Sequence, residues 1–386
     1  MRAPLIWAIA VGALGCAARS YEGVLSVCDV RQALPVAPAP VGPRATRNVV
    51  VVTLDGVRWQ EMFGGTDAAL AERDHLPRCG ELSARALMPN IYRRFVDGGV
   101  VVGAPDHGPT IEASGPTFVS LPGYEEIFLG RPGRGCADNE CGPVVEPTLI
   151  DALHAQFPAR GEVAIVSSWE RIDRVAAANL SSVAASTGRT RGPTRDQLAV
   201  TPEARALLDA GARAGASPGH HDYRPDRFTG PLALAYLAAQ RPRFLFIGLG
   251  DADEHAHAND YPRYLGSLRD ADAFIAALFR TLEGLGRYGQ ETTVVVTVDH
   301  GRDPNFEEHG YSAASGRVWL MASGGAVPRR GLVTTTLAYR LADVAPTVRA
   351  LLDVAPDRAL TAGRPIDEVL PSVMAQHAGS PLPLVR

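Results

Sequence analysis

Long apolar runs recur along this chain, and they predict its regular structure. The run NVVVVTLDG at 48–56 contains four consecutive valines and lacks the polar alternation of a half-exposed strand. Such a run is typical of a strand that is buried on both faces, as in a parallel sheet. Comparable runs stand at 162–168, 243–250, 292–301 and 317–325.

Helical periodicity occurs between these runs, most clearly at 261–284, where apolar residues recur every three or four positions. Strands that alternate with helices predict βαβ units, so we expect an α/β fold with a mostly parallel central sheet and helices on both faces. Two regions, 64–90 and 177–225, are rich in Ala, Arg, Gly and Pro and show weak periodicity. We expect them to form loop insertions over the sheet.

The first residues have the pattern of an export signal, which we place at 1–17. Arg2 precedes an apolar segment that is too short to span a bilayer, and small residues follow it. The stretch ALGC also resembles a bacterial lipoprotein signal, in which Cys16 would be lipidated and attach the protein to a membrane. Ala13 stands where such signals usually have leucine, so ordinary secretion is the alternative. We expect a periplasmic or outer-membrane lipoprotein, otherwise a secreted protein, with a Pro/Ala-rich tether at 18–47 and a catalytic domain at 48–386.

The other cysteines agree with an oxidising compartment. Without Cys16 an even four of the five cysteines remain, and Cys136 and Cys141 close the short loop CADNEC. We expect a disulfide there, because a metal knuckle would need two further soft ligands nearby. The net charge of −4 and the lack of basic runs with interleaved aromatics argue against a nucleic-acid surface.

Acids and histidines follow three of the apolar runs. Active sites of parallel sheets lie at the carboxyl ends of the strands, so these side chains are candidates for one site, although a lone acid there is often only a helix cap. Asp and His without Cys suit Zn²⁺ or Mn²⁺ in an open catalytic site. Six ligands make two sites of three, and two such cations can clamp an in-line displacement at phosphorus. The candidates are Asp55, Asp253, His257, Asp299, His300 and His309.

Ser120 is a candidate nucleophile. It stands in TFVSLPGYEEIFLG at 117–130, directly before a segment that we expect to be helical. A hydroxyl near a helix start lies among backbone N–H groups that favour an incoming anion, and a bound zinc ion can make its alkoxide available. The alternative is that Ser120 only caps the helix, with Pro122 in the first turn.

In this order the motifs resemble the alkaline phosphatase superfamily, most closely its nucleotide pyrophosphatase/phosphodiesterase-like branch. The similarity covers about 48–352 and ends near LADVAPTVRALLDV at 341–354. The resemblance implies that Ser120 is a metal-bound nucleophile that forms a covalent phospho-seryl intermediate. It also implies that one metal binds Asp55, Asp299 and His300, and that the other binds Asp253, His257 and His309.

Two departures from the family pattern bear on the substrate. Many phosphodiesterases of this group have Thr-x-Pro-Asn-His, whereas this chain has Gly123 and Tyr124 after Pro122, which puts a preference for nucleotide diesters in doubt. Sulfatases of the superfamily have an arginine where Tyr124 stands.

The segment GDADEHAHAND contains two overlapping Asp-x-x-x-His pairs, Asp251/His255 and Asp253/His257. The pairs are offset by two residues, about 200° around a helix, so only one can face a metal. Similar proteins have a tryptophan at the position of His255, which favours the second pair. We then expect Asp251 to cap a helix or to bind a ligand histidine.

The sequence therefore predicts an enzyme: an exported, two-metal hydrolase of small phosphate esters, either a phosphomonoesterase or a phosphodiesterase. The alternatives are a catalytically silent surface protein of the same fold, a sulfatase, or a phospho-group transferase. The natural substrate cannot be inferred from these motifs.

Overall fold

A computed structural model describes residues 45–356 and 362–371 of the chain. The predicted export signal at 1–17, with Cys16, and nearly all of the predicted tether at 18–47 lie outside the described residues. Within the described ranges, no helix combines the length and the apolar character needed to cross a membrane.

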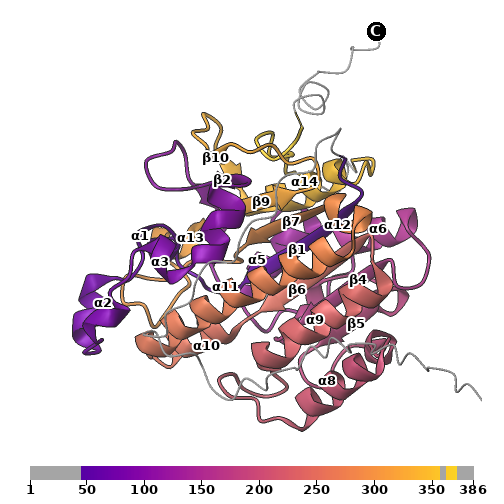
Figure 1. The fold of residues 1–386 in the computed structure, drawn as a ribbon, viewed down its shortest axis with the longest axis horizontal. Helices are drawn as coiled ribbons and strands as arrows, with labels where there is room; N and C mark the ends of the chain where they lie inside the picture. Colours follow the sequence, from indigo (N-terminus) through magenta and orange to yellow (C-terminus); the bar gives the residue numbers. More distant parts are fainter. Residues whose placement is uncertain (1–44, 357–361, 372–386) are drawn as a thin grey trace, which may run out of the picture.

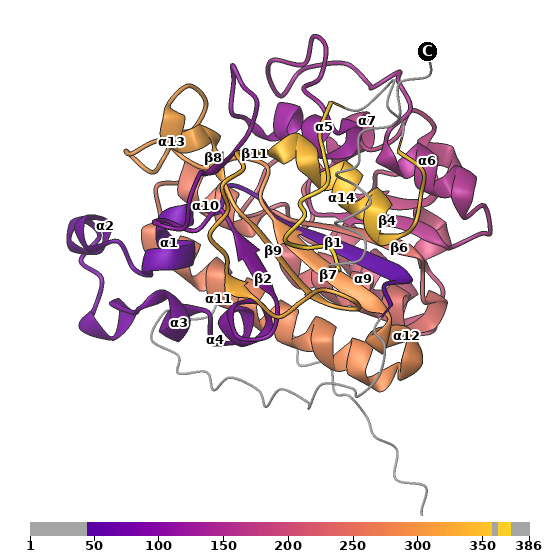
Figure 2. The ribbon, with the colours of Figure 1, turned by 90° about the horizontal axis from the view of Figure 1, so that it is seen from above.

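A large central sheet forms the middle layer (Figures 1 and 2). Its strand order is β10-β2-β9-β7-β1-β6-β4-β5, and β9 is antiparallel to both of its neighbours while the other pairs are parallel. The prediction of a mostly parallel sheet is confirmed. The strands are β1 (Asn48–Leu54), β2 (Val100–Val102), β4 (Val163–Ser167), β5 (Ala184–Thr187), β6 (Phe244–Leu249), β7 (Thr292–Thr297), β9 (Leu320–Gly324) and β10 (Gly331–Leu332). A second, small sheet has the order β11 (Tyr339–Arg340), β3 (Ile111–Glu112) and β8 (Arg317–Val318).

Helices cover both faces of the central sheet, as predicted. Figure 2 shows α9 (Asp226–Gln240), α11 (Tyr261–Gly284) and α12 (Arg287–Gln290) on one face, and α5 (Ser120–Leu129), α6 (Leu149–Gln156) and α14 (Val344–Leu351) on the other. All seven residues of β1 are buried, because β6 and β7 flank this strand and helices lie above and below it. This burial explains why the valine run at 48–54 shows no polar alternation.

The predicted insertion at 177–225 needs a correction. Residues 184–187 of this region form β5, which pairs with β4 at the edge of the sheet. The sequence there is Ala-Ala-Ser-Thr, which has too few β-branched and aromatic residues to predict a strand. The rest of the region contains α8 (Pro202–Arg213). The other insertion, 64–90, forms short helices such as α2 (Ala68–Arg73) and α3 (Ala84–Leu87).

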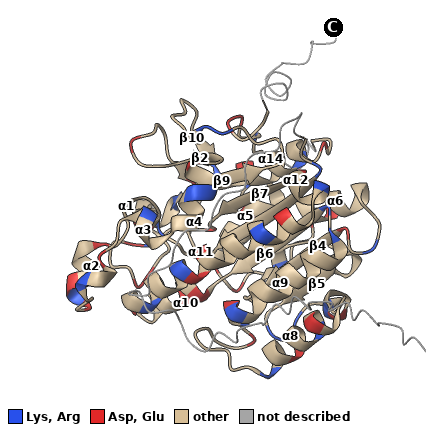
Figure 3. Ribbon diagram, in the orientation of Figure 1, with Lys and Arg blue, Asp and Glu red and all other residues tan. Residues whose placement is uncertain are grey.

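Charged residues are spread over the helices around the sheet. In the view of Figure 3, basic and acidic positions are interspersed along α8 and α2. This view therefore shows no face of a single sign that would attract a strongly charged partner.

Phe246 of β6 connects the sheet to α5. Its side chain is fully buried, and its ring packs edge-on against Phe128 at 4.8 Å and Tyr124 at 6.2 Å between centroids, both on α5. We expect Phe246→Ala to lower the free energy of unfolding by about 3–5 kcal/mol, because the cavity cannot be refilled. Urea denaturation measures this change. The control Val145→Ala removes a side chain that is 86% exposed and should change stability by less than about 0.5 kcal/mol. Equal effects of the two substitutions would contradict the packing described here.

Candidate active site

Three adjacent strands deliver the predicted ligands to one place. Asp55 follows β1, α10 (Asp251–His257) follows β6, and Asp299 and His300 follow β7. These strands are neighbours in the order β7-β1-β6 and run parallel, so their carboxyl ends meet at one edge of the sheet. The backbone allows close approach here: Gly56 has φ +61°, and a Cβ atom at Gly56 would lie 2.1 Å from Oδ1 of Asp253.

The first group of candidate ligands consists of Asp55, Asp299 and His300. Their potential ligand atoms all lie within 4.8 Å of one another, and all three side chains are buried. Nε2 of His300 lies 3.5 Å from Oδ1 of Asp55 and 3.4 Å from Oδ2 of Asp299. That Oδ2 atom has no hydrogen-bond partner among the described residues. A buried carboxylate oxygen without a donor is costly unless a cation lies beside it, so this group fits a metal ion.

The second group consists of Asp253, His257 and His309. Nε2 of His257 lies 3.2 Å from Oδ2 of Asp253 and 3.0 Å from Nε2 of His309. Within a limit of 4.8 Å between potential ligand atoms, however, the structure groups Asp253 and His309 with His300 rather than with the predicted His257, so His300 belongs to both clusters.

The histidine tautomers also suit metal binding. Nδ1 of His300 donates to the backbone carbonyl of Gly301 at 2.7 Å, and Nδ1 of His309 donates to that of Phe118 at 3.0 Å. These bonds place the Nδ1 proton and leave Nε2 of both rings directed into the site. Metal-binding histidines are commonly held in this way.

Electrostatics favour positive charge at this site. Burial and the neighbouring Asp55 carboxylate raise the pKa of Asp299 well above its usual range. Burial opposes the charged form of His300, but the carboxylates of Asp299 and Asp55 outweigh it and raise the pKa of His300 to about 10. Metal ions compete with protons for such groups, so the preference for a proton at Nε2 is also a preference for a cation.

Ser120 lies beside the first group. It is the first residue of α5 and is 5% exposed, and its Oγ atom lies 3.1 Å from Nε2 of His300 and 3.4 Å from Oδ1 of Asp55. The alternative interpretation as a helix cap is not supported, because Val119 is the N-cap residue and no side chain caps this helix. Gly123 brings the first turn of α5 close to β7, since a Cβ atom there would lie 2.4 Å from the carbonyl oxygen of Asp299.

The other Asp-x-x-x-His pair faces away from this site. Oδ1 of Asp251 accepts hydrogen bonds from the Tyr223 hydroxyl at 2.7 Å and from the backbone N–H of Asp226, the first residue of α9, at 3.1 Å. Asp251 thus anchors the start of α9 by accepting from the N–H of its first residue, but it is not an N-cap residue, since Pro225 has that position in α9 and Gly250 has it in α10. His255 is buried, its Nε2 atom has no partner among the described residues, and burial lowers its pKa to about 4, so it is a neutral core side chain.

Three further residues surround the site: Tyr124 was noted in the sequence only as a departure from the family pattern, and Asn139 and Arg302 were not singled out. The Tyr124 hydroxyl donates to Oδ2 of Asp55 at 2.9 Å, and Oδ1 of Asn139, within the disulfide loop, accepts from the Leu121 N–H at 2.8 Å. Arg302 is fully buried and donates to Oδ1 of Asp253. No local pattern predicts the contacts of Asn139, whereas Arg302 directly follows Asp-His-Gly and could have been noted for that reason.

The predicted disulfide between Cys136 and Cys141 is present. Its loop contacts α5 through Asn139, and Nη1 of Arg171 donates to the Glu140 carboxylate of this loop at 2.6 Å. The disulfide loop therefore borders the start of α5.

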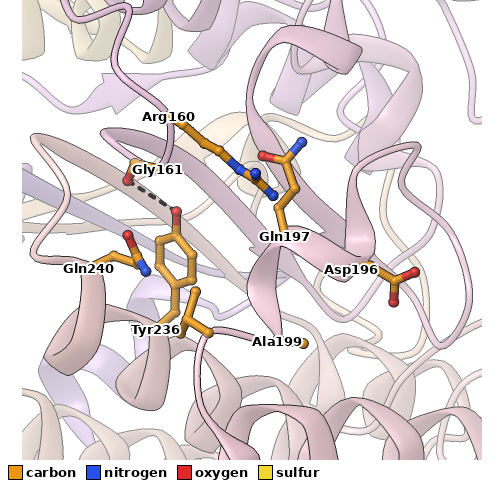
Figure 4. Close-up of a pocket in the computed structure, with 8 residues that line it drawn as sticks. Arg160, Gly161, Asp196, Gln197, Ala199, Tyr236 and Gln240 are labelled. Atoms are coloured by element: carbon orange, nitrogen blue, oxygen red, sulfur yellow. Dashed lines mark hydrogen bonds between the residues drawn. The ribbon is translucent and has the colours of Figure 1, made fainter.

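A cavity of about 230 Å³ lies elsewhere, near the amino end of β4 (Figure 4). Gly161, just before β4, and Gln240, at the end of α9, line it. The Tyr236 hydroxyl inside it donates to the Gly161 carbonyl at 3.0 Å. Because the candidate ligands stand at the carboxyl ends of the strands, this cavity is not part of their site.

Comparison with known proteins agrees with this geometry. The family model for type I phosphodiesterase / nucleotide pyrophosphatase matches residues 126–355, which includes the candidate ligands from Asp253 to His309 but begins after Asp55 and Ser120. No curated protein matches the chain.

Several solved structures share the fold. Wild-type alkaline phosphatase PafA is 13% identical with a TM-score of 0.51, over 86% of this chain and 100% of that one. A phosphonate monoester hydrolase from Silicibacter pomeroyi is also 13% identical, with a TM-score of 0.53 over 83% of this chain and 76% of that one. A putative sulfatase from Bacteroides thetaiotaomicron has the same identity and TM-score, over 83% of this chain and 74% of that one.

The chain thus shares the fold of these structures, and the described residues contain two candidate clusters of metal ligands. Because the family model covers more than half of the sequence, the chain belongs to the type I phosphodiesterase / nucleotide pyrophosphatase family.

Proposed function

We propose that the protein is an exported, two-metal hydrolase of small phosphate esters with Ser120 as its nucleophile. One observation carries the proposal: the Ser120 hydroxyl lies 3.1 Å from Nε2 of His300 and 3.4 Å from Oδ1 of Asp55, two candidate ligands of the first group. A serine that only stabilised the helix would have no reason to face these side chains.

Two metal ions fit the residues present. Asp55, Asp299 and His300 would hold one, and Asp253, His257 and His309 the other, with Zn²⁺ favoured over Mn²⁺ by the ligand types. When bound, the ions would supply Lewis-acid charge for the phosphoryl oxygens and would lower the pKa of the serine hydroxyl.

The protein's own residues then supply orientation and the covalent step. Ser120, as its alkoxide, attacks phosphorus; the Ser Oγ–P bond forms while the bond from phosphorus to the leaving alcohol breaks. Water next attacks phosphorus, breaks the Oγ–P bond and restores the serine. At the start of α5 the Leu121 N–H donates to Asn139 and the Gly123 N–H to the Val119 carbonyl, and Pro122 lacks an N–H, which leaves the Ser120 N–H for a phosphoryl oxygen.

Tyr124 bears on the choice between phosphate and sulfate esters. It occupies the position of the sulfatase arginine, and its hydroxyl donates to Oδ2 of Asp55, so its role is to hold a candidate ligand. Burial raises the pKa of Tyr124 well above its usual range, which keeps this donor protonated at neutral pH. We therefore propose phosphate esters as the substrate class.

Ser120→Ala tests the nucleophile. We expect kcat for p-nitrophenyl phosphate or bis-p-nitrophenyl phosphate to fall by several orders of magnitude, because the covalent route is removed. Ser182→Ala, in a surface turn, is the matched control and should leave kcat unchanged. If Ser120→Ala turns over every ester at the wild-type rate, the assignment is wrong, and a preference for p-nitrophenyl sulfate would indicate a sulfatase.

Asp253→Asn and Asp251→Asn test the ligand assignment. Asp253→Asn should remove most activity and about one metal per chain, because an amide oxygen is a poor ligand for zinc. Asp251→Asn should keep both metals, since an amide oxygen can still accept from Tyr223 and Asp226. Metal per chain is measured by elemental analysis after dialysis. The reverse pattern would assign the ligand role to Asp251.

Export is tested in cells. We expect the protein in the periplasm or outer membrane of a bacterial host, with processing at Cys16 that globomycin blocks. Processing that globomycin does not affect, together with release of the protein, would indicate ordinary secretion. A cytoplasmic, unprocessed chain would contradict the proposal of export.

A further inference from the structure

Arg302 is a buried cation that contacts members of the second ligand group and the loop that precedes His309. Its side chain is 0% exposed, and its guanidinium group has four partners in the protein. Nη1 donates to Oδ1 of Asp253, Nη2 donates to the carbonyl of Glu307 and lies 3.4 Å from Nδ1 of His257, and Nε donates to the carbonyl of Phe306 at 2.6 Å.

These partners belong to two elements that are remote in sequence. Asp253 and His257 stand on α10, whereas the two carbonyl groups belong to the loop 303–309, which carries His309. The guanidinium group therefore connects all three members of the second ligand group. It makes no hydrogen bond or ion pair with Asp55, Asp299 or His300 of the first group.

Besides its hydrogen bonds with Arg302, the loop 303–309 is held in place by the side chain of Phe306. The side chain of Phe306 is fully buried, and its ring packs edge-on against Tyr261 at 5.2 Å and Tyr264 at 5.0 Å between centroids. Phe306 has φ +73°, a left-handed conformation that is uncommon for a large side chain. A backbone held in this conformation turns its carbonyl to the guanidinium group while its ring fills the aromatic cluster.

We infer that Arg302 is a positioning residue for one of the two metal sites, the site of Asp253, His257 and His309. This inference rests on the proposed function, because it presumes that these residues bind a metal. By taking Oδ1 of Asp253, Arg302 leaves Oδ2 as the oxygen that faces the imidazoles, 3.2 Å from Nε2 of His257. By holding the carbonyls of residues 306 and 307, it fixes the path of the chain to His309.

The geometry of the guanidinium group explains why an arginine stands here. Its planar fork directs donors in several fixed directions at once and stays charged when it is buried, whereas a lysine ammonium is a point charge on a flexible stem. A lysine could reach the carboxylate or the carbonyls but could not reproduce the whole arrangement.

The test measures zinc binding, apart from activity. Wild type, Arg302→Met and Arg302→Lys are loaded with Zn²⁺, and both the stoichiometry and the affinity of each site are measured by competition with a chromogenic chelator. Wild type should bind two ions. Arg302→Met should keep one ion with unchanged affinity and bind the other about 10- to 100-fold more weakly, the usual effect of losing a residue that orients metal ligands. Arg302→Lys should weaken the same site by a smaller factor.

Arg224→Met is the matched control. Arg224 is also 0% exposed, but it donates to Ser186 and to the carbonyl of Ser167, outside the site. We expect this variant to lower the Tm and to bind both ions with wild-type affinity.

The outcomes separate this inference from the proposed function. If wild type binds no zinc, the proposed metal sites are wrong, and so is the role of Arg302. If wild type binds two ions and Arg302→Met binds both equally well, only the inference is overturned. Weakening of both sites alike in the arginine variants would indicate general loosening of the fold and would also overturn it. If Arg302→Met does not fold, Arg302→Lys decides, because unchanged affinity at both sites contradicts the inference.

Discussion

Three buried carboxylates at the ends of three neighbouring strands impose the constraint on which the site depends. Asp55, Asp253 and Asp299 are each less than 10% exposed, and like charges this close cannot all be ionised without positive charge among them. The chain supplies part of that charge through His300 and Arg302. An arrangement of this kind costs stability unless something binds there, so it is understood most simply as a site for cations.

The fold brings the three carboxylates together because glycines allow backbone segments at the strand ends to approach closely. Strands β7, β1 and β6 end side by side, Gly56 makes room for the Asp253 carboxylate, and Gly123 lets α5 rest on the backbone of Asp299. Phe246 of β6 packs against Tyr124 and Phe128 of α5 and so holds this helix against the sheet. The packing of the core therefore places the helix that carries Ser120, and the hydroxyl then contacts His300 and Asp55.

Much of this architecture could be predicted from the sequence, and the features that were missed have identifiable physical reasons. The valine run at 48–54 and the helix at 261–284 were predicted because burial on both faces and a 3.6-residue period leave clear patterns. β5 left no such pattern, because a short alanine-rich edge strand gains its stability from its neighbour β4. The offset of Asp251 and Asp253 around a helix predicted only that one of them can face the site, and the family resemblance selected Asp253. The contacts of Arg302 could not be predicted, since they join a loop and a helix that meet only in the folded chain.

The central claim is that two metal ions flank Ser120, and anomalous X-ray diffraction at the zinc edge tests it most directly. A crystal of the zinc-loaded protein should show two anomalous peaks roughly 4 Å apart. One should lie against Asp55, Asp299 and His300, the other against Asp253, His257 and His309, with Oγ of Ser120 beside both. A single peak, or peaks away from these side chains, would contradict the account.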